Sequence, residues 1–192
     1  MAAEAVTYPL RYDVAYPEKL SRWLISVKWL LAIPHFLILY VLGNVQGIMT
    51  LIAFFAILFT RRYPRGLFNF VVNVYRWTAN VGAYVGFQRD EYPPFDWQPG
   101  KYAVTFEADY PQELSRWLIL VKWLLAIPHF FVLAFLGVAA IVVLVVAWFA
   151  ILFTERFPRG LFDYVVGVTR WAFRVTAYVN LLRDEYPSFS LT

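Results

Sequence analysis

Cysteine is absent from this chain, and histidine occurs only twice. Without cysteine there is no disulfide, no thiolate nucleophile and no thiolate metal ligand, and the redox compartment is left open. Charge is scarce too, because Asp, Glu, Lys and Arg make up 16% of the residues, against about 25% in ordinary globular proteins. The GxSxG, HExxH, Walker and dinucleotide-binding glycine patterns do not occur. We therefore expect a non-enzymatic protein with no catalytic residue, cofactor or metal site.

Apolar and aromatic residues dominate what is present: the chain is 61% hydrophobic and 20% aromatic. A soluble domain of 192 residues cannot bury that much apolar surface, so we predict an integral membrane protein. Eight Trp and thirteen Tyr suit a membrane–water boundary. The net charge of +4 comes without basic runs, which favours an anionic lipid surface over nucleic acid. The N-terminal MAAEAVTYPLRYDVAYPEKL has no basic start before an apolar core, so no cleavable signal is expected.

The chain contains a long internal repeat. YPEKLSRWLISVKWLLAIPHF, which begins at Tyr16, returns at Tyr110 as YPQELSRWLILVKWLLAIPHF, and the alignment runs without a gap to RDEYPPF and RDEYPSF. A repeat of this length indicates two copies of one structural unit. We place them at residues 1–97 and 98–192, joined in the polar, Pro- and Gly-containing segment Asp96–Lys101. Residues paired by this alignment are called equivalent below.

Each unit opens with a predicted short strand, at Tyr8–Pro17 and Tyr102–Pro111. Apolar and polar residues alternate there, as in Leu10, Arg11 and Tyr12. Pairing between the two strands is left open, because their spacing does not require it.

The apolar body of each unit, Trp29–Thr60 and Trp123–Thr154, contains no charged residue. As one straight helix each body would be about 48 Å long, against a hydrocarbon core of about 30 Å, so each must bend, tilt or double back. We predict transmembrane helical hairpins that turn at Gly43–Gly47 and Gly137–Ala140. The alternative is an interfacial helix up to the proline of LAIPHF followed by one long span, which the unbroken apolar run of the second copy favours.

All 17 Lys and Arg lie outside these two bodies, and neither predicted turn is charged. Under the positive-inside rule the turns face away from the cytoplasm, while the basic side and both termini face it. An odd number of spans per unit would invert the second copy, yet both copies keep similar basic positions. We therefore predict a mainly α-helical, multi-pass protein of the plasma or inner membrane with about four transmembrane spans.

A further helix per unit is predicted at Arg65–Gln88 and Arg159–Leu182. It is amphipathic, because its polar residues are spaced to form one stripe. Such a helix can lie in the interface, with Val74 and Trp77 facing lipid, or it can be a tilted span with its stripe in a bundle interior. The interfacial placement is our prediction. The stripe of the first copy consists of Asn69, Asn73, Arg76 and Asn80.

Lys28 and His35, with their equivalents Lys122 and His129, are the candidate polar site inside the membrane. Their spacing of seven places both on one face of a helix, and ionisable groups at membrane depth are costly enough to suggest a function. That function would be ion conduction along this stripe, or ligation of a haem or pigment if the two imidazoles meet across a pseudo-twofold axis. The simpler interpretation is that the lysine extends to the interface and the imidazole hydrogen-bonds a neighbour.

The loops after the apolar bodies are candidate sites for lipid headgroups. Pro and Gly of the repeated Pro-Arg-Gly motif allow a turn into the next helix, whose free backbone N–H groups and arginines can hold a phosphate. Arginines that only solvate their loops are the simpler interpretation. The acids of RDEYPPF and RDEYPSF are expected to pair with loop arginines or to solvate a helix end. The candidate headgroup residues are Arg61, Arg62, Arg65, Arg156 and Arg159.

Three segments, RWLISVKWLLAIPHF, FFAILFTRRYPRGLF and RDEYPPF, return in closely similar form in the second copy. With them the chain resembles a prokaryotic family of small membrane proteins known only as a domain of unknown function, present here as two tandem copies. The resemblance covers nearly the whole chain. It implies the membrane fold and the repeat, and it brings no activity.

The function that we expect is that of a scaffold or accessory subunit in a membrane complex, with an anionic-lipid-binding cytoplasmic face. Such a protein forms a homo-oligomer or joins a larger assembly. The competing hypotheses are a small channel or carrier that uses the Lys28 and His35 stripe, a membrane-shaping hairpin protein, and a haem or pigment protein.

Overall fold

The computed structural model describes residues 8–192, which form six helices and two strands. Each element of the first unit returns at the equivalent residues of the second, so the predicted repeat is confirmed. The N-terminal segment in which no cleavable signal is expected lies partly outside the described residues. The elements are β1 Leu10–Val14, α1 Leu24–Leu31, α2 Ile33–Thr60, α3 Arg65–Val85, β2 Val104–Ala108, α4 Leu118–Leu125, α5 Ile127–Thr154 and α6 Arg159–Val179.

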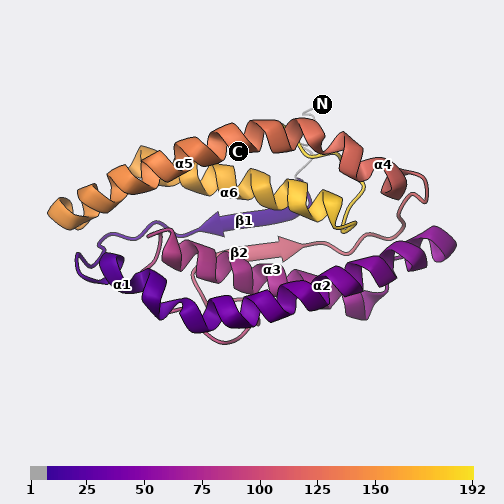
Figure 1. Ribbon diagram of the computed structural model, residues 1–192, viewed down its shortest axis with the longest axis horizontal. Coiled ribbons are helices and arrows are strands. Elements are labelled where there is room, and N and C mark those ends of the chain that lie inside the picture. The colour runs from indigo at the N-terminus through magenta and orange to yellow at the C-terminus, as the bar shows by residue number, and fades with distance from the viewer. Residues whose placement is uncertain (1–7) are drawn as a thin grey trace, which may run out of the picture.

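The elements pack in layers around a two-stranded antiparallel sheet (Figure 1). Helices α3 and α6 flank the sheet, and the long helices α2 and α5 form the outermost layers. The strands of the two copies pair with each other, with Leu10 opposite Ala108 and Tyr12 opposite Phe106. Residues of β1 are alternately buried and exposed, as their alternating polarity predicts.

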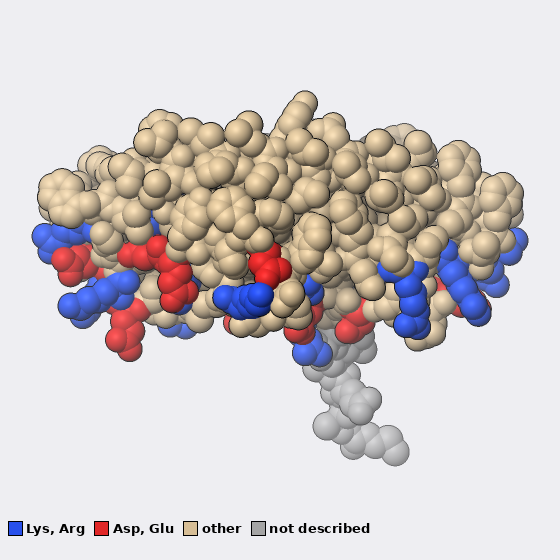
Figure 2. Space-filling view, turned by 90° about the horizontal axis from the view of Figure 1, so that it is seen from below, with Lys and Arg blue, Asp and Glu red and all other residues tan. Residues whose placement is uncertain are grey.

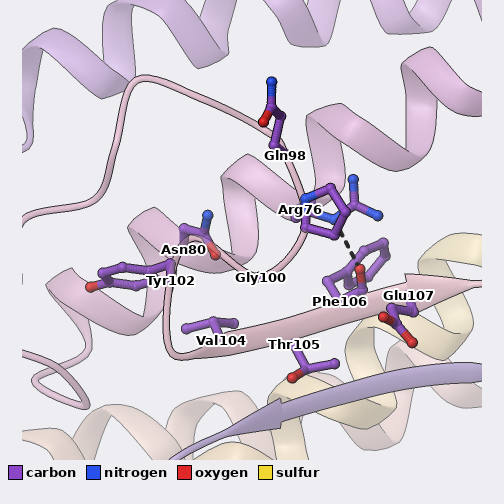
Figure 3. Close-up of a pocket in the computed structure, with 10 residues that line it drawn as sticks. Arg76, Asn80, Gln98, Gly100, Tyr102, Val104, Thr105, Phe106 and Glu107 are labelled. Atoms are coloured by element: carbon purple, nitrogen blue, oxygen red, sulfur yellow. Dashed lines mark hydrogen bonds between the residues drawn. The ribbon is translucent and has the colours of Figure 1, made fainter.

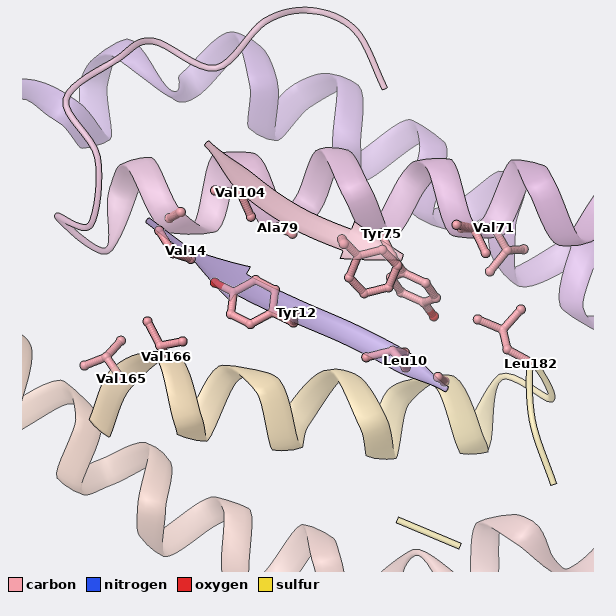
Figure 4. Close-up of a cluster of buried hydrophobic side chains, with 14 of the residues drawn as sticks. Leu10, Tyr12, Val14, Val71, Tyr75, Ala79, Val104, Val165, Val166 and Leu182 are labelled. Atoms are coloured by element: carbon pink, nitrogen blue, oxygen red, sulfur yellow. The ribbon is translucent and has the colours of Figure 1, made fainter. Parts of the chain in front are cut away.

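Each strand packs against a helix of the opposite unit: β1 contacts α6, and β2 contacts α3. Arg170 on α6 donates from Nε to the Tyr12 carbonyl at 2.8 Å, and Arg76 on α3 donates to the Phe106 carbonyl at 3.2 Å. Figure 4 shows the shared core, in which apolar side chains of the sheet, among them Leu10, lie between α3 and α6. The two units are therefore interlocked through their strands.

A break at Ala32 separates α1 from α2, two residues before Pro34. Pro34 occupies the first turn of α2, where its missing N–H costs no helical hydrogen bond. A helix running without a break from α1 through Pro34 would lose that hydrogen bond and bring the proline ring against the carbonyl four residues earlier. Ala126 and Pro128 repeat this arrangement before α5. The break thus arises from local sequence and recurs in both units.

After that break each apolar body continues as one uninterrupted helix, so the predicted hairpins are wrong. Gly43–Gly47 lies inside α2, and Gly137–Ala140 lies inside α5. Gly and Asn cost a helix about 1 kcal/mol or less relative to Ala, and the Asn44 amide donates to the Tyr40 carbonyl one turn back at 2.7 Å. The alternative prediction, a break near the proline and then one long helix, matches the observed bounds.

Without hairpins, the part of the chain that the structure describes has fewer segments that can cross a bilayer than the four predicted. Among the described residues, two helical segments are long and apolar enough to cross a membrane, Ile33–Thr60 and Leu118–Thr154. The second combines α4 and α5.

Both long helices end at a residue with left-handed backbone conformation, Arg61 at φ 62° and Glu155 at φ 60°. The carbonyls of these residues then accept hydrogen bonds from the opposite unit. The Leu114 N–H donates to the Arg61 carbonyl, and the Leu20 N–H donates to the Glu155 carbonyl, each at 2.8 Å. The end of each long helix is thereby attached to the start of the other unit.

Helices α3 and α6 are inner helices, packed between the sheet and the long helices. Their existence is confirmed, but the prediction that Val74 and Trp77 face lipid is wrong, since these side chains are buried at 2% and 7% exposure. Part of the polar stripe also faces protein. Arg76 donates from Nη1 to the Asn73 side chain at 2.7 Å and to the Trp97 carbonyl at 2.9 Å.

Candidate functional site

In the view of Figure 2 the visible charged side chains gather along one edge of the molecule, and the opposite edge shows none. Figure 2 is turned by 90° from Figure 1, so the direction from the charged face to the uncharged face is the shortest axis. The long helices run along the longest axis in Figure 1. Both α2 and α5 therefore lie parallel to the uncharged surface rather than pointing through it.

The exposed residues of α2 and α5 are large and apolar. On α2, Leu37 is 65% exposed and Phe59 is 73% exposed, and on α5 the equivalent residues Phe131 and Phe153 are 69% and 73% exposed. Little of either candidate span is buried within the protein: 17% of the most apolar stretch of Ile33–Thr60, and 6% of that of Leu118–Thr154. Core helices of soluble domains are mostly buried, so this exposure calls for an apolar partner outside the chain. We call the exposed apolar surface of α1, α2, α4 and α5 the charge-free face.

Four tryptophans lie exposed on or beside the short helices α1 and α4. Trp23 and Trp117 are 85% and 78% exposed, and Trp29 and Trp123 are each 60% exposed. The Trp29 indole N–H donates to the Ser26 carbonyl at 2.9 Å, and Trp123 makes the equivalent bond. An indole that is exposed, apolar over most of its surface and polar at one edge is the side chain most favoured at a membrane–water boundary.

Lys28 is fully buried and forms an ion pair. Its Nζ lies 2.8 Å from an Asp90 carboxylate oxygen, 2.5 Å from the Arg89 carbonyl oxygen and 5.1 Å from the centre of the Tyr84 ring. The other Asp90 oxygen accepts the Ser21 N–H. Lys122 repeats these contacts in the second unit, with Asp184 at 2.8 Å. The lysine therefore fastens α1 to the RDEYPPF segment, and its ammonium group is fully engaged with protein atoms.

His35 is also fully buried, in an aromatic cluster that extends through Tyr92 and Tyr84 to Lys28. Its Nδ1 accepts the Trp77 indole N–H at 3.0 Å, and its ring stacks on Phe95 at 4.1 Å between centroids. Because Nδ1 accepts, a neutral His35 carries its proton on Nε2, which has no hydrogen-bond partner among the described residues. His129 repeats this geometry with Trp171 and Phe189.

The two imidazoles do not meet. His35 lies at the start of α2 and His129 at the start of α5, and Figure 1 shows these helix starts at opposite ends of the molecule. The hypothesis in which both histidines ligate one haem or pigment across the pseudo-twofold axis is therefore wrong. Lys28 and His35 also differ in their polar partners. Lys28 binds Asp90 and the Arg89 carbonyl, whereas His35 accepts from Trp77.

The five loop arginines are exposed, and two of them stack on tyrosines of the opposite unit. The Arg65 guanidinium lies 4.7 Å from the centre of the Tyr110 ring, and Arg159 lies 4.6 Å from that of Tyr16. Arg159 also pairs with Asp163 at 3.3 Å. Arg65 and Arg159 thus help to join the units. The remaining three, Arg61, Arg62 and Arg156, have no carboxylate closer than 3.9 Å in the described part of the chain.

A small cavity of about 110 Å³ lies beside Arg76 (Figure 3). Asn80, Tyr102 and Glu107 help to line it, and the dashed line marks the bond from Arg76 to the Phe106 carbonyl. Burial lowers the pKa of Arg76, and the nearby Glu107 carboxylate opposes that shift. A cavity of this size holds a few water molecules. We therefore infer a structural role for Arg76, which connects α3 to β2.

The partners of Lys28 and His35 were missed by sequence reasoning. The acids of RDEYPPF were expected to pair with loop arginines or to solvate a helix end. Instead Asp90 neutralises Lys28, and Phe95 of the same segment stacks on His35. Glu91 pairs with its neighbour Arg89 at 3.0 Å. A signal was present, because a lysine on an apolar helix requires a counter-ion and the repeated RDEYP segment offers one in each copy.

Comparisons with known proteins agree with this duplicated architecture. Neither the curated proteins nor the solved structures compared with the chain match it. The family described as Domain of unknown function (DUF4389) matches twice, at residues 22–96 and 116–190, which together cover more than half of the chain. Both matches contain the lysine, histidine and RDEYP residues of one unit. The chain therefore belongs to the DUF4389 family and carries two tandem copies of its domain.

Proposed function

We propose that the protein is a non-enzymatic membrane scaffold that occupies one leaflet of the bilayer. In this proposal the charge-free face lies in the hydrocarbon, and the charged face lies among the headgroups of the cytoplasmic leaflet. The observation that carries the proposal is the separation of charged from apolar surface across the shortest axis, with α2 and α5 parallel to the boundary (Figure 2). The exposed tryptophans beside α1 and α4 support the same placement.

An in-plane position is favoured over a transmembrane one by the charges of the central sheet. Arg11 and Asp13 on β1 and Glu107 on β2 are exposed, and the sheet lies midway along the long helices (Figure 1). If α2 and α5 stood across the bilayer, these side chains would lie near its midplane. Each charge there costs about 2.5–3.5 kcal/mol on insertion scales. Lying flat, the molecule keeps all three at the polar boundary.

The test uses spin labels on one face of α2. Leu37, Ile48 and Phe59 are exposed, and their spacing of eleven residues places them on the same side of the helix. Each is changed to Cys in a chain that has no native cysteine, and the labelled protein is placed in vesicles that contain phosphatidylglycerol. We expect three similar, shallow depths by oxygen and nickel accessibility, with a control label at Glu107 in water.

A depth gradient from Leu37 to Phe59 would contradict the proposal. A spanning helix would separate these two labels by about 33 Å along the membrane normal. The three depths therefore distinguish the two orientations without reference to any activity.

Membrane shaping is a second candidate function, and the same asymmetry favours it. A protein that inserts a broad apolar face into one leaflet widens that leaflet more than the other, so purified protein would tubulate vesicles unaided. A scaffold instead self-assembles or co-purifies with a partner.

The channel hypothesis has less support, since Lys28 and Lys122 are each buried and paired with an aspartate. It predicts vesicle flux that Lys28→Ala and Lys122→Ala abolish.

A further inference from the structure

The ends of the two long helices differ in charge, although the surrounding architecture is the same. Glu155 ends α5 and forms an ion pair with Arg22 at 3.0 Å. The equivalent residue at the end of α2 is Arg61, and the equivalent of Arg22 is Arg116. One helix end therefore pairs opposite charges, whereas the other places two guanidinium groups together. Arg61 and Arg116 line one cavity of about 250 Å³, with Ser115 and Trp117.

The positive charge at this cavity is only weakly neutralised by protein. Arg61 approaches Glu113 at 3.9 Å, and both side chains are more than half exposed, so the pair contributes little. Arg116 donates to the Phe59 carbonyl at 3.3 Å, which leaves other guanidinium N–H groups for a ligand. Two guanidinium groups beside an exposed indole suit a phosphate ester at a membrane boundary.

An apolar groove of about 340 Å³ lies between the same two helices, α2 and α4. Gly47 and Phe54 of α2 form one side, and Ile119 and Trp123 of α4 form the other. From Phe54 to Arg61 the distance along the helix axis is about 10 Å at 1.5 Å per residue. A headgroup-sized cavity and an acyl-chain-sized groove therefore lie one after the other along α2, and we call the two together the crevice.

The equivalent groove on α5 has a similar volume, about 330 Å³, but a different wall. Ile141 stands there in place of Gly47. A Cβ built on Gly47 meets no atom within 4 Å, so the first groove has free space where the second has a branched side chain. Both differences, Gly47 against Ile141 and Arg61 against Glu155, favour a ligand at the first crevice.

We propose that the crevice between α2 and α4 binds one anionic phospholipid. The phosphate lies between Arg61 and Arg116, and one acyl chain follows the groove beside Gly47. The inference rests on the proposed function, because the groove receives an acyl chain when the charge-free face is in the bilayer. The equivalent crevice of the other unit is closed to a phosphate by the pair of Arg22 and Glu155.

The experiment is native mass spectrometry of the full chain released from nanodiscs that contain phosphatidylglycerol and phosphatidylcholine. Arg61→Glu and Gly47→Ile each replace a residue of the crevice by its equivalent from the other unit. Their matched controls are Lys19→Glu, which also replaces an exposed basic residue by its acidic equivalent but lies outside the crevice, and Gly43→Ile, at an open position outside the groove. We expect retained phosphatidylglycerol on the parent and both controls, and about tenfold lower occupancy on the two test variants.

Vesicle flotation of the same proteins separates this inference from the proposed function. If all variants float like the parent and Arg61→Glu or Gly47→Ile keeps full lipid occupancy, the inference is overturned alone. Equal retention of phosphatidylcholine also overturns it, because the crevice would then not select charge. If the parent itself fails to float with phosphatidylglycerol vesicles, the proposed function fails and this inference fails with it.

Discussion

Lys28 shows how a buried charge is made tolerable on an apolar helix. Its ammonium group has no exposed surface, yet Asp90, the Arg89 carbonyl and the Tyr84 ring surround it. A buried ion pair contributes little relative to a well-packed apolar pair, but removing one partner leaves an uncompensated charge. We therefore expect the ion pair to specify which segment covers α1.

Changing Asp90 to Asn should destabilise the protein more than changing Lys28 to Met. The first variant leaves a fully buried ammonium without its carboxylate, at a cost of about 3–5 kcal/mol in the free energy of unfolding. The second leaves Asp90, whose side chain is 28% exposed and keeps its bond from the Ser21 N–H. The double variant should recover most of the loss. Chemical unfolding in detergent measures all three.

Vesicle flux adds a readout for the channel hypothesis. The double variant Lys28→Met with Asp90→Asn retains the packing and removes both charges. If the parent conducts ions and this folded variant does not, Lys28 has a role beyond architecture. Equal behaviour of parent and variant supports the structural role.

At the scale of elements, Gly43 distinguishes the continuous helix from the predicted hairpin. Gly in a helix interior costs about 1 kcal/mol relative to Ala, and a Cβ at Gly43 meets no atom within 4 Å. We therefore expect Gly43→Ala to raise the free energy of unfolding by about 0.5–1 kcal/mol. At a turn with positive φ the same change would be destabilising.

Gly167→Ala is the matched contrast for that measurement. It is also a helix-interior glycine, on α6, but its Cβ would lie 2.8 Å from the Leu191 carbonyl oxygen. Loss of stability there and gain at Gly43 would support the packing described for both helices. A loss at Gly43 would contradict the continuous α2.

The elements were predictable where the signal is local. The break before Pro34 follows from the missing N–H, and the strand at Leu10–Val14 follows from alternating polarity. The hairpin turn was wrong because Gly and Asn favour a turn only weakly, and because the prediction assumed that a long apolar helix must cross the bilayer. A helix lying flat meets no such length limit. The contact of Lys28 with Asp90 joins distant parts of the sequence, and no local pattern encodes it.

At the scale of the whole molecule, exchange of strands between the units explains why the repeat forms one body. Each unit on its own has a strand without a partner and an inner helix without its covering strand. The register is symmetric: Tyr12 faces its own equivalent, Phe106, while Leu10 faces Ala108, the equivalent of Val14. Two copies of the first unit can therefore pair in the same register as the natural halves.

The last prediction follows from that symmetry. Residues 1–97 expressed alone should form a homodimer, with Tyr12 opposite Tyr12 and each strand packed on the other copy's Arg65–Val85 helix. Co-expressed with residues 98–192, they should form a heterodimer instead, because only there does Arg22 meet Glu155, whereas a homodimer places it beside Arg61. Light scattering in detergent gives the mass, and a Cys at Tyr12 reports self-pairing by disulfide formation. A folded monomer of residues 1–97 would contradict the interlocked architecture.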